Sequence, residues 1–207
     1  MKKKGAAPMG GKTKKKTSKE KRLCGYGLSP EGDTLEQMLE CYCKKFRPVL
    51  AEYLNVFRKY DLDDVIRYAT GSVCPCCGLR HPHQRRLSGH VLEEFAGRLQ
   101  SLSDQIKKAE NFESLHELVV RARIKGIGPV TLYDAALRIS AKLSILPQKV
   151  VYLHGHALIP QMPGTHKMDI SGFAPQFSRK NLTAYEIEEF LCVFNARLVE
   201  KNITVTK

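Results

Sequence analysis

Two runs of residues with a helical spacing of apolar side chains meet at the short segment Ile124–Thr131. Such a spacing puts the apolar side chains on one face of a helix, and Asn111 is a suitable N-cap for the first run. The sequence therefore predicts two packed helices joined by a tight turn. The apolar positions are Leu115, Leu118, Val119 and Ala122 before the segment, and Val130, Tyr133, Ala136 and Leu137 after it.

The turn between these helices leaves backbone N–H groups uncovered. Gly126 and Gly128 have no side chain to shield them, and Pro129 suits the first helical position, where its missing N–H has no partner to lose. The amino-terminal end of a helix carries partial positive charge and attracts anions such as phosphate. Lys125 adds a full positive charge. The segment indicates a phosphate-binding turn; the alternative is an interhelical corner with a structural role only.

The order hydrophobic-x-Gly-hydrophobic-Gly in Ile124–Gly128 resembles the helix-hairpin-helix motif, and the likeness covers about residues 112–144. In that family the hairpin amides grip the sugar-phosphate backbone of DNA without reading the sequence, sometimes through a bound monovalent cation. The resemblance implies that Gly126, Ile127 and Gly128 contact DNA through their backbone. It also implies side-chain contacts from Lys125 and Thr131.

Base-excision glycosylases use the same hairpin together with a catalytic Asp at the start of a later helix. The corresponding stretch here, Leu146–His154, contains no carboxylate. Asp134 lies inside the second helix of the hairpin, and Asp169 lies much further along the chain. We therefore do not expect glycosylase or lyase chemistry.

The layout of the chain also resembles a group of small bacterial proteins whose activity is uncharacterised. The resemblance rests on the segments His81–Arg86, Ile124–Asp134 and Val151–His154 and spans most of residues 35–200. It implies a shared architecture but does not predict a particular reaction.

The formal net charge of +13 suggests a polyanionic partner, but the charge is unevenly distributed. Residues 1–22 hold nine Lys and one Arg against one Glu, a net of +9, so residues 23–207 carry only +4. This first segment has few large apolar residues and should be a disordered basic arm. Such an arm would strengthen non-specific, salt-sensitive attachment to nucleic acid. A solubilising terminus is the alternative.

No apolar run long enough for a signal peptide or a transmembrane helix is found, so we expect a cytoplasmic protein without membrane contact.

Seven cysteines in such a chain favour reduced thiols or metal ligands over a disulfide framework. Cys74 and Cys77 form half of a structural zinc site, which His81 and His83 could complete. Completion by Cys41 and Cys43, or free thiols in a loop, are the alternatives.

The segment His81–Arg86 concentrates imidazole and guanidinium groups. Arg85 and Arg86 can clamp phosphate, which would give a second contact with nucleic acid. The alternatives are pairing of these arginines with acids such as Glu93 and Glu94, or catalysis. A nuclease or repair-type enzyme would use a histidine pair, either His81 with His83 or His154 with His156.

For the fold, the sequence predicts one mainly α-helical domain of about seven helices over residues 23–207, with no strand showing a convincing alternation. We expect Asp33 or Thr34 to cap the first helix, Pro48 to interrupt it, and one long helix to run from Gly89 to Lys108. Thr183 and Glu186 have the spacing of a capping box at the start of a last helix.

The function expected from the sequence is DNA binding without sequence specificity, with RNA the less favoured partner. Enzymatic activity is the second hypothesis and is not the favoured one. A protein–protein scaffold, in which the hairpin is only a corner, is the third. Nothing in the sequence fixes the oligomeric state.

Overall fold

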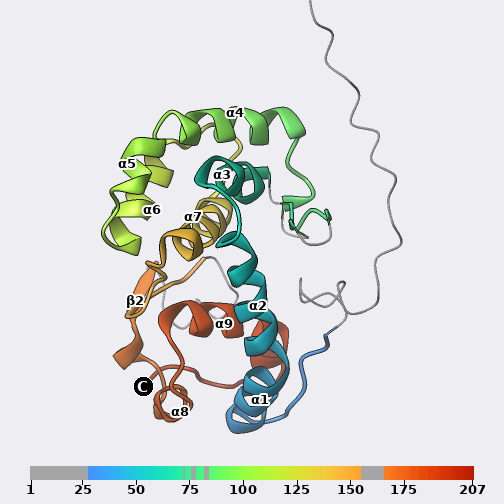
Figure 1. Cartoon of the computed structure of the whole chain (residues 1–207). Coiled ribbons are helices and arrows are strands. Elements are labelled where there is room, and N and C mark those ends of the chain that lie inside the picture. The colour runs from blue at the N-terminus through green and yellow to red at the C-terminus, as the bar shows by residue number, and fades with distance from the viewer. Residues whose placement is uncertain (1–27, 72, 76–77, 82–83, 155–165) are drawn as a thin grey trace, which may run out of the picture.

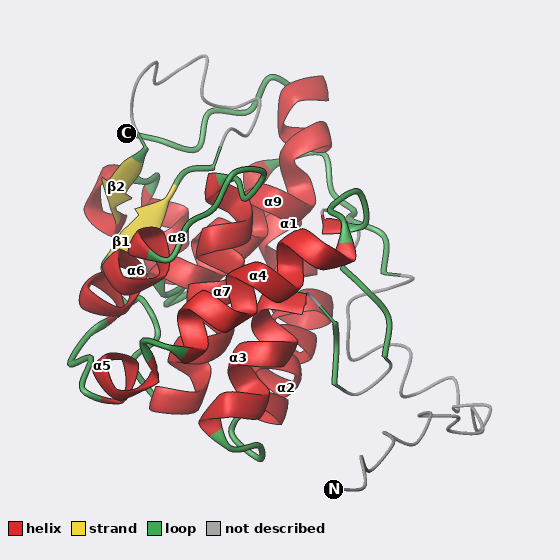
Figure 2. Ribbon diagram, turned by 90° about the horizontal axis from the view of Figure 1, so that it is seen from above, coloured by secondary structure: helices red, strands yellow, loops and turns green. Residues whose placement is uncertain are grey.

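The structure is a computed structural model that describes residues 28–71, 73–75, 78–81, 84–154 and 166–207. The basic arm expected at residues 1–22 lies outside this range. The described residues are mainly helical, as predicted (Figures 1 and 2). None of their helices is both long enough and apolar enough to cross a membrane.

The elements follow one another along the chain as several helices, a small hairpin of two strands, and two final helices (Figure 1). They are α1 (Leu35–Cys41), the π-helix η2 (Tyr42–Phe46), α2 (Arg47–Phe57), α3 (Leu62–Gly71), α4 (Gly89–Gln100), α5 (Ser103–Lys107), α6 (Phe112–Arg121), α7 (Pro129–Leu143), β1 (Val150–Tyr152), β2 (Lys167–Asp169), the 3-10 helix η5 (Ile170–Gly172), α8 (Pro175–Arg179) and α9 (Ala184–Glu200).

The first helical stretch begins as predicted but does not stop at Pro48. Thr34 caps α1 in a capping box with Gln37. The chain then passes through the π-helical turn η2, and the N–H of Arg47 donates to the carbonyl of Tyr42. This wider turn brings Pro48 into the first turn of α2, where a residue without an N–H is tolerated. The predicted interruption is therefore a π-helical turn.

The single helix predicted from Gly89 to Lys108 is wrong, because the chain breaks between α4 and α5. At the break, the Ser101 hydroxyl donates to the carbonyl of Arg98, 2.7 Å away. Serine side chains that bond the backbone in this way compete with the regular helix. The change of direction buries both Leu99 and Ile106.

The prediction that the chain has no strand is also wrong. β1 and β2 pair antiparallel, with Val151 opposite Met168. Each strand has three residues, too few for an alternating pattern to stand out. The two strands lie on either side of residues 153–166.

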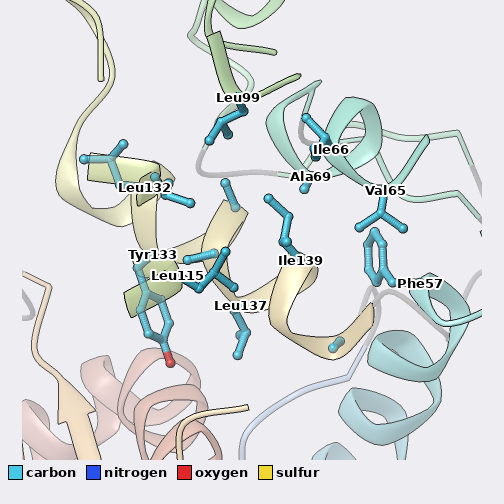
Figure 3. Packing of buried hydrophobic residues seen from close by; sticks show 14 of the residues in the cluster. Phe57, Val65, Ile66, Ala69, Leu99, Leu115, Leu132, Tyr133, Leu137 and Ile139 are labelled. Atoms are coloured by element: carbon cyan, nitrogen blue, oxygen red, sulfur yellow. The ribbon is translucent and has the colours of Figure 1, made fainter. Parts of the chain in front are cut away.

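The buried side chains form two clusters. The larger one surrounds α7, which packs against α2, α3 and α6 (Figure 3). The smaller one joins α1, α8 and α9. Strand β1 contributes to both clusters, since Val151 belongs to the smaller cluster and Tyr152 to the larger. Helix α2 runs between the two groups of helices (Figure 1).

Candidate nucleic-acid interface

The segment between α6 and α7 forms a tight turn held by two buried isoleucines. Ile124 and Ile127 are both buried, Ile127 to 1% exposure, and the N–H of Ile127 donates to the carbonyl of Ile124 over 3.2 Å. Between them the backbone of Gly126 has a φ of +97°, which residues with a side chain rarely adopt. Lys125 and Gly126 are exposed. The isoleucines thus fix the turn while its tip faces solvent.

Several backbone N–H groups of the turn and of the first turn of α7 have no hydrogen-bond acceptor among the described residues. Within the described part of the chain, the N–H groups of Gly126, Gly128, Val130 and Thr131 have no hydrogen-bond partner. Gly128 is the N-cap of α7 and offers no side chain to cap it. Pro129 occupies the first turn, as predicted. The positive end of a 15-residue helix is therefore open at an exposed turn.

Two arginines brace the carbonyl side of this turn. The Arg123 Nε donates to the carbonyl of Ile127 over 2.9 Å, and Arg98 of α4 donates to the carbonyl of Arg123 over 3.4 Å. Arg98 also pairs with Glu94. Lys125 has no ion-pair partner among the described residues. The turn is thus lined by positive charge.

One oxygen of this turn is unfavourable for the monovalent cation that the helix-hairpin-helix resemblance implies. A cation would need carbonyl oxygens from the turn. The carbonyl of Ile127 accepts the Arg123 guanidinium, whose charge would repel a cation at that oxygen.

The other residues predicted to contact DNA, Thr131, Arg85 and Arg86, differ in how exposed their side chains are. The side chain of Thr131 is buried, at 7% exposure, so only its backbone N–H is available to a partner. Arg85 and Arg86 are exposed in the turn just before α4. Glu94, one of the acids that could pair with these arginines, forms an ion pair with Arg98. Helix α4 brings its Val91 side chain beside Gly126, which places the start of this helix next to the hairpin.

The knuckle predicted around Cys74 is partly formed. The N–H of Cys74 donates to the carbonyl of Leu79, and the N–H of Gly78 donates to the carbonyl of Cys74 over 2.8 Å. Cys77 and His83, the other predicted ligands, lie outside the described residues. Nε2 of His81 is engaged with the Tyr53 hydroxyl at 2.7 Å. A zinc site with His81 would thus depend on its other ring nitrogen.

Cys41 and Cys43 do not complete this site. They pack against the smaller cluster, whereas Cys74 belongs to the larger one. Among the described residues, no three His, Cys, Asp or Glu side chains are placed to share a metal ion.

The same loop is tied to the core by a polar network that local spacing could not reveal. The Gln84 amide donates to Asp134 Oδ2 over 2.6 Å, and Arg138, only 4% exposed, donates to the Tyr53 hydroxyl over 2.9 Å. Asp134 and Arg138 also form an ion pair, four residues apart on α7. His81 and Gln84 thus connect the loop to α2 and α7.

His156, half of the second predicted histidine pair, lies outside the described residues.

Comparison with protein-family models, with curated proteins and with solved structures finds no match to this chain.

Proposed function

We propose that the protein binds DNA without sequence specificity through the turn between α6 and α7. The observation that carries this proposal is the group of four uncovered backbone N–H groups at the start of α7, beside the exposed Lys125. Helix amino-terminal amides and a neighbouring ammonium group are suited to phosphate oxygens. The likeness of Ile124–Gly128 to the helix-hairpin-helix motif points to the same ligand.

The basic segment at residues 1–22 and the exposed Arg85 and Arg86 would add to the affinity. Each positive group that replaces a counterion on the duplex makes binding more sensitive to salt. Backbone amides that meet phosphates position a protein on nucleic acid but carry no base information. We therefore expect similar affinity for duplexes of different sequence, and weaker binding to RNA.

Three substitutions at Gly128 should affect DNA binding to different degrees and so test this proposal. Its φ of −88° and ψ of 169° suit any residue, and a Cβ there would meet no atom within 4 Å. In the full chain, Gly128→Ala should bind duplex DNA about as well as the unsubstituted protein. Gly128→Asn should bind more weakly, because its side chain would cap the amides of α7. Gly128→Asp should bind weakest, with a salt slope smaller by about one charge.

The same series separates loss of binding from loss of folding. Asp and Asn are good N-caps and Asp favours the positive helix end, so both variants should melt at or above the temperature of Gly128→Ala. Binding would be measured by fluorescence anisotropy over a salt titration, with residues 1–22 present in every variant. Equal affinity and equal salt slope across all three variants would show that the hairpin does not touch the DNA.

A further inference from the structure

A hollow of ligand size lies beside α2, and none of the hairpin residues lines it. Its volume is about 380 Å³, which is within the range of sites that bind small molecules. Residues of α2 form one wall. Leu146, from the segment after α7, and Tyr185, near the start of α9, complete the lining. Three parts of the chain that are far apart in the sequence therefore border one space.

Part of this lining is apolar and rests on the core. Leu54 is 4% exposed and belongs to the larger cluster, and Leu146 and Tyr185 are half-buried and pack against the same cluster. The hydrocarbon part of a ligand could therefore leave water in the hollow.

The polar part of the lining comes from α2 alone and carries both signs of charge. Glu52, Asn55 and Arg58 follow one another at intervals of three residues, and all three line the hollow. Six residues of helix rise by about 9 Å, so the carboxylate and the guanidinium approach the hollow from well-separated points. Neither Glu52 nor Arg58 forms an ion pair among the described residues.

The Arg58 side chain is held in place by the end of α7. Its Nε donates to the carbonyl of Ala141 over 3.3 Å, and Lys142 donates to the carbonyl of Arg58 over 3.2 Å. The two terminal nitrogens of this guanidinium have no hydrogen-bond partner in the described part of the chain. Such a pair of nitrogens can bind a carboxylate through two parallel hydrogen bonds. One end of the hollow is thus suited to a carboxylate.

We propose that this hollow binds a small zwitterion whose ammonium and carboxylate groups are separated by a short apolar chain. Arg58 receives the carboxylate, Glu52 accepts hydrogen bonds from the ammonium group, and Leu54 contacts the chain between them. A ligand with a single charge leaves either Glu52 or Arg58 without a partner. The proposal does not rest on DNA binding.

Nuclear magnetic resonance of the isotope-labelled full chain would test the site, because shifts of backbone amides both measure weak binding and locate it. The probe is 6-aminohexanoate. Hexanoate, which lacks the ammonium group, and n-hexylammonium, which lacks the carboxylate, are matched controls. We expect 6-aminohexanoate to give saturable shifts in α2. Each control should bind about fivefold more weakly or worse, because one charged pair is lost.

Two substitutions would link the binding to the hollow. Arg58→Gln should weaken the affinity for 6-aminohexanoate about fivefold or more, for the same reason. Ala51→Leu puts a good helix former at an exposed position that lines the hollow, so it should block binding and keep the fold. Lys59→Gln is the control, since it removes a positive charge from an exposed neighbour outside the lining, and it should leave the affinity unchanged.

The proposal is overturned if 6-aminohexanoate gives no saturable shifts, if the shifts lie away from α2, or if either singly charged control binds as tightly. It is also overturned if Arg58→Gln or Ala51→Leu binds like the unsubstituted chain. A loss in Lys59→Gln as large as that in Arg58→Gln would mean a general effect of charge, and the assignment to the hollow would fail. DNA affinity is measured separately, so either proposal can fail alone.

Discussion

A single buried residue, Arg138, organises much of the polar interior of the larger cluster. Its guanidinium connects α7 to the carbonyl of Ala69 at the end of α3 and to the Tyr53 hydroxyl on α2. The same hydroxyl lies 2.7 Å from Nε2 of His81, and the tautomer of the imidazole decides which of the two groups donates. A charge this deeply buried is tolerated only when its donors are satisfied, as they are here.

Glu189 gives the protein a pH dependence of stability that a substitution can remove. Burial, together with the nearby charges of Glu188 and Asp134, raises its pKa to about 8 in the folded protein, from about 4.5 without the fold. The folded state therefore binds a proton more tightly, and this stabilisation is full below pH 4.5 and is lost as the pH rises through about 8. We expect this contribution to the free energy of unfolding to fall between about pH 4.5 and about pH 8 and to change no further above that, and Glu189→Gln to remove the fall.

Urea denaturation followed by circular dichroism at several pH values would measure this effect. His116 acts in the opposite direction, because burial and then Lys167 lower its pKa to about 4. Its contribution is complete above its ordinary pKa of 6.5 and is lost as the pH falls through about 4. The interval from about pH 6.5 to about pH 8 thus isolates Glu189. Glu94→Gln, on the exposed face of α4, should keep the slope of the unsubstituted protein; an unchanged slope in Glu189→Gln would contradict the assignment.

At the scale of the elements, helix ends were more predictable from the sequence than helix continuity. The N-cap at Asn111 and the capping box at Thr183 both occur where their spacing predicted them. Each depends on residues three apart, so local sequence contains the whole signal. The break between α4 and α5 depends on a serine bonding its own backbone, which apolar periodicity does not report.

The cap of α6 supports the first half of the hairpin. Oδ1 of Asn111 accepts the N–H of Ser114 over 2.9 Å, and the Ser114 hydroxyl donates back to the carbonyl of Asn111. Asn111→Ala leaves an exposed N–H uncapped and should lower the free energy of unfolding by about 1 kcal/mol. Asn111→Asp keeps an acceptor and adds a charge that suits the helix start, so it should lose nothing. Chemical denaturation compares the two; equal losses in both would mean that the cap contributes nothing.

At the scale of the whole molecule, the polar contacts within the larger cluster join distant parts of the sequence. Gln84 and Asp134 lie 50 residues apart, and Tyr53 and Arg138 lie 85 apart. No local pattern links such residues. The hairpin, by contrast, is made of consecutive residues, and its turn, its Pro129 and its glycines could be predicted.

A further connection between distant parts of the sequence joins α2 to α9. Arg47, at the start of α2, donates to both carboxylate oxygens of Glu186 on α9, at 2.7 and 3.2 Å, and also to the carbonyls of Lys180 and Asn181. Glu186 is 6% exposed and also accepts the N–H of Thr183. The sequence predicted this local capping contact but gave no sign of Arg47, 139 residues earlier.

Arg47→Met should therefore weaken the connection between the clusters. It leaves a buried carboxylate without its cation, which costs about 3 kcal/mol because Arg47 itself is partly exposed. Replacing Glu186 by Gln as well should recover part of the loss, since the stranded charge is then removed. Lys45→Met, which breaks an exposed pair with Glu31, should cost less than about 1 kcal/mol.

Hydrogen exchange would locate the loss, because amides of α9 should lose protection in Arg47→Met before those of α7. The chain has no Trp, so global unfolding is followed by circular dichroism. If α7 and α9 lose protection equally, the two clusters unfold as one unit whose cooperativity comes from their shared elements α2 and β1. The ion pair would then be only one local contact among many. A selective loss in α9 would instead identify Arg47 as the residue that couples the smaller cluster to the helix presenting the hairpin.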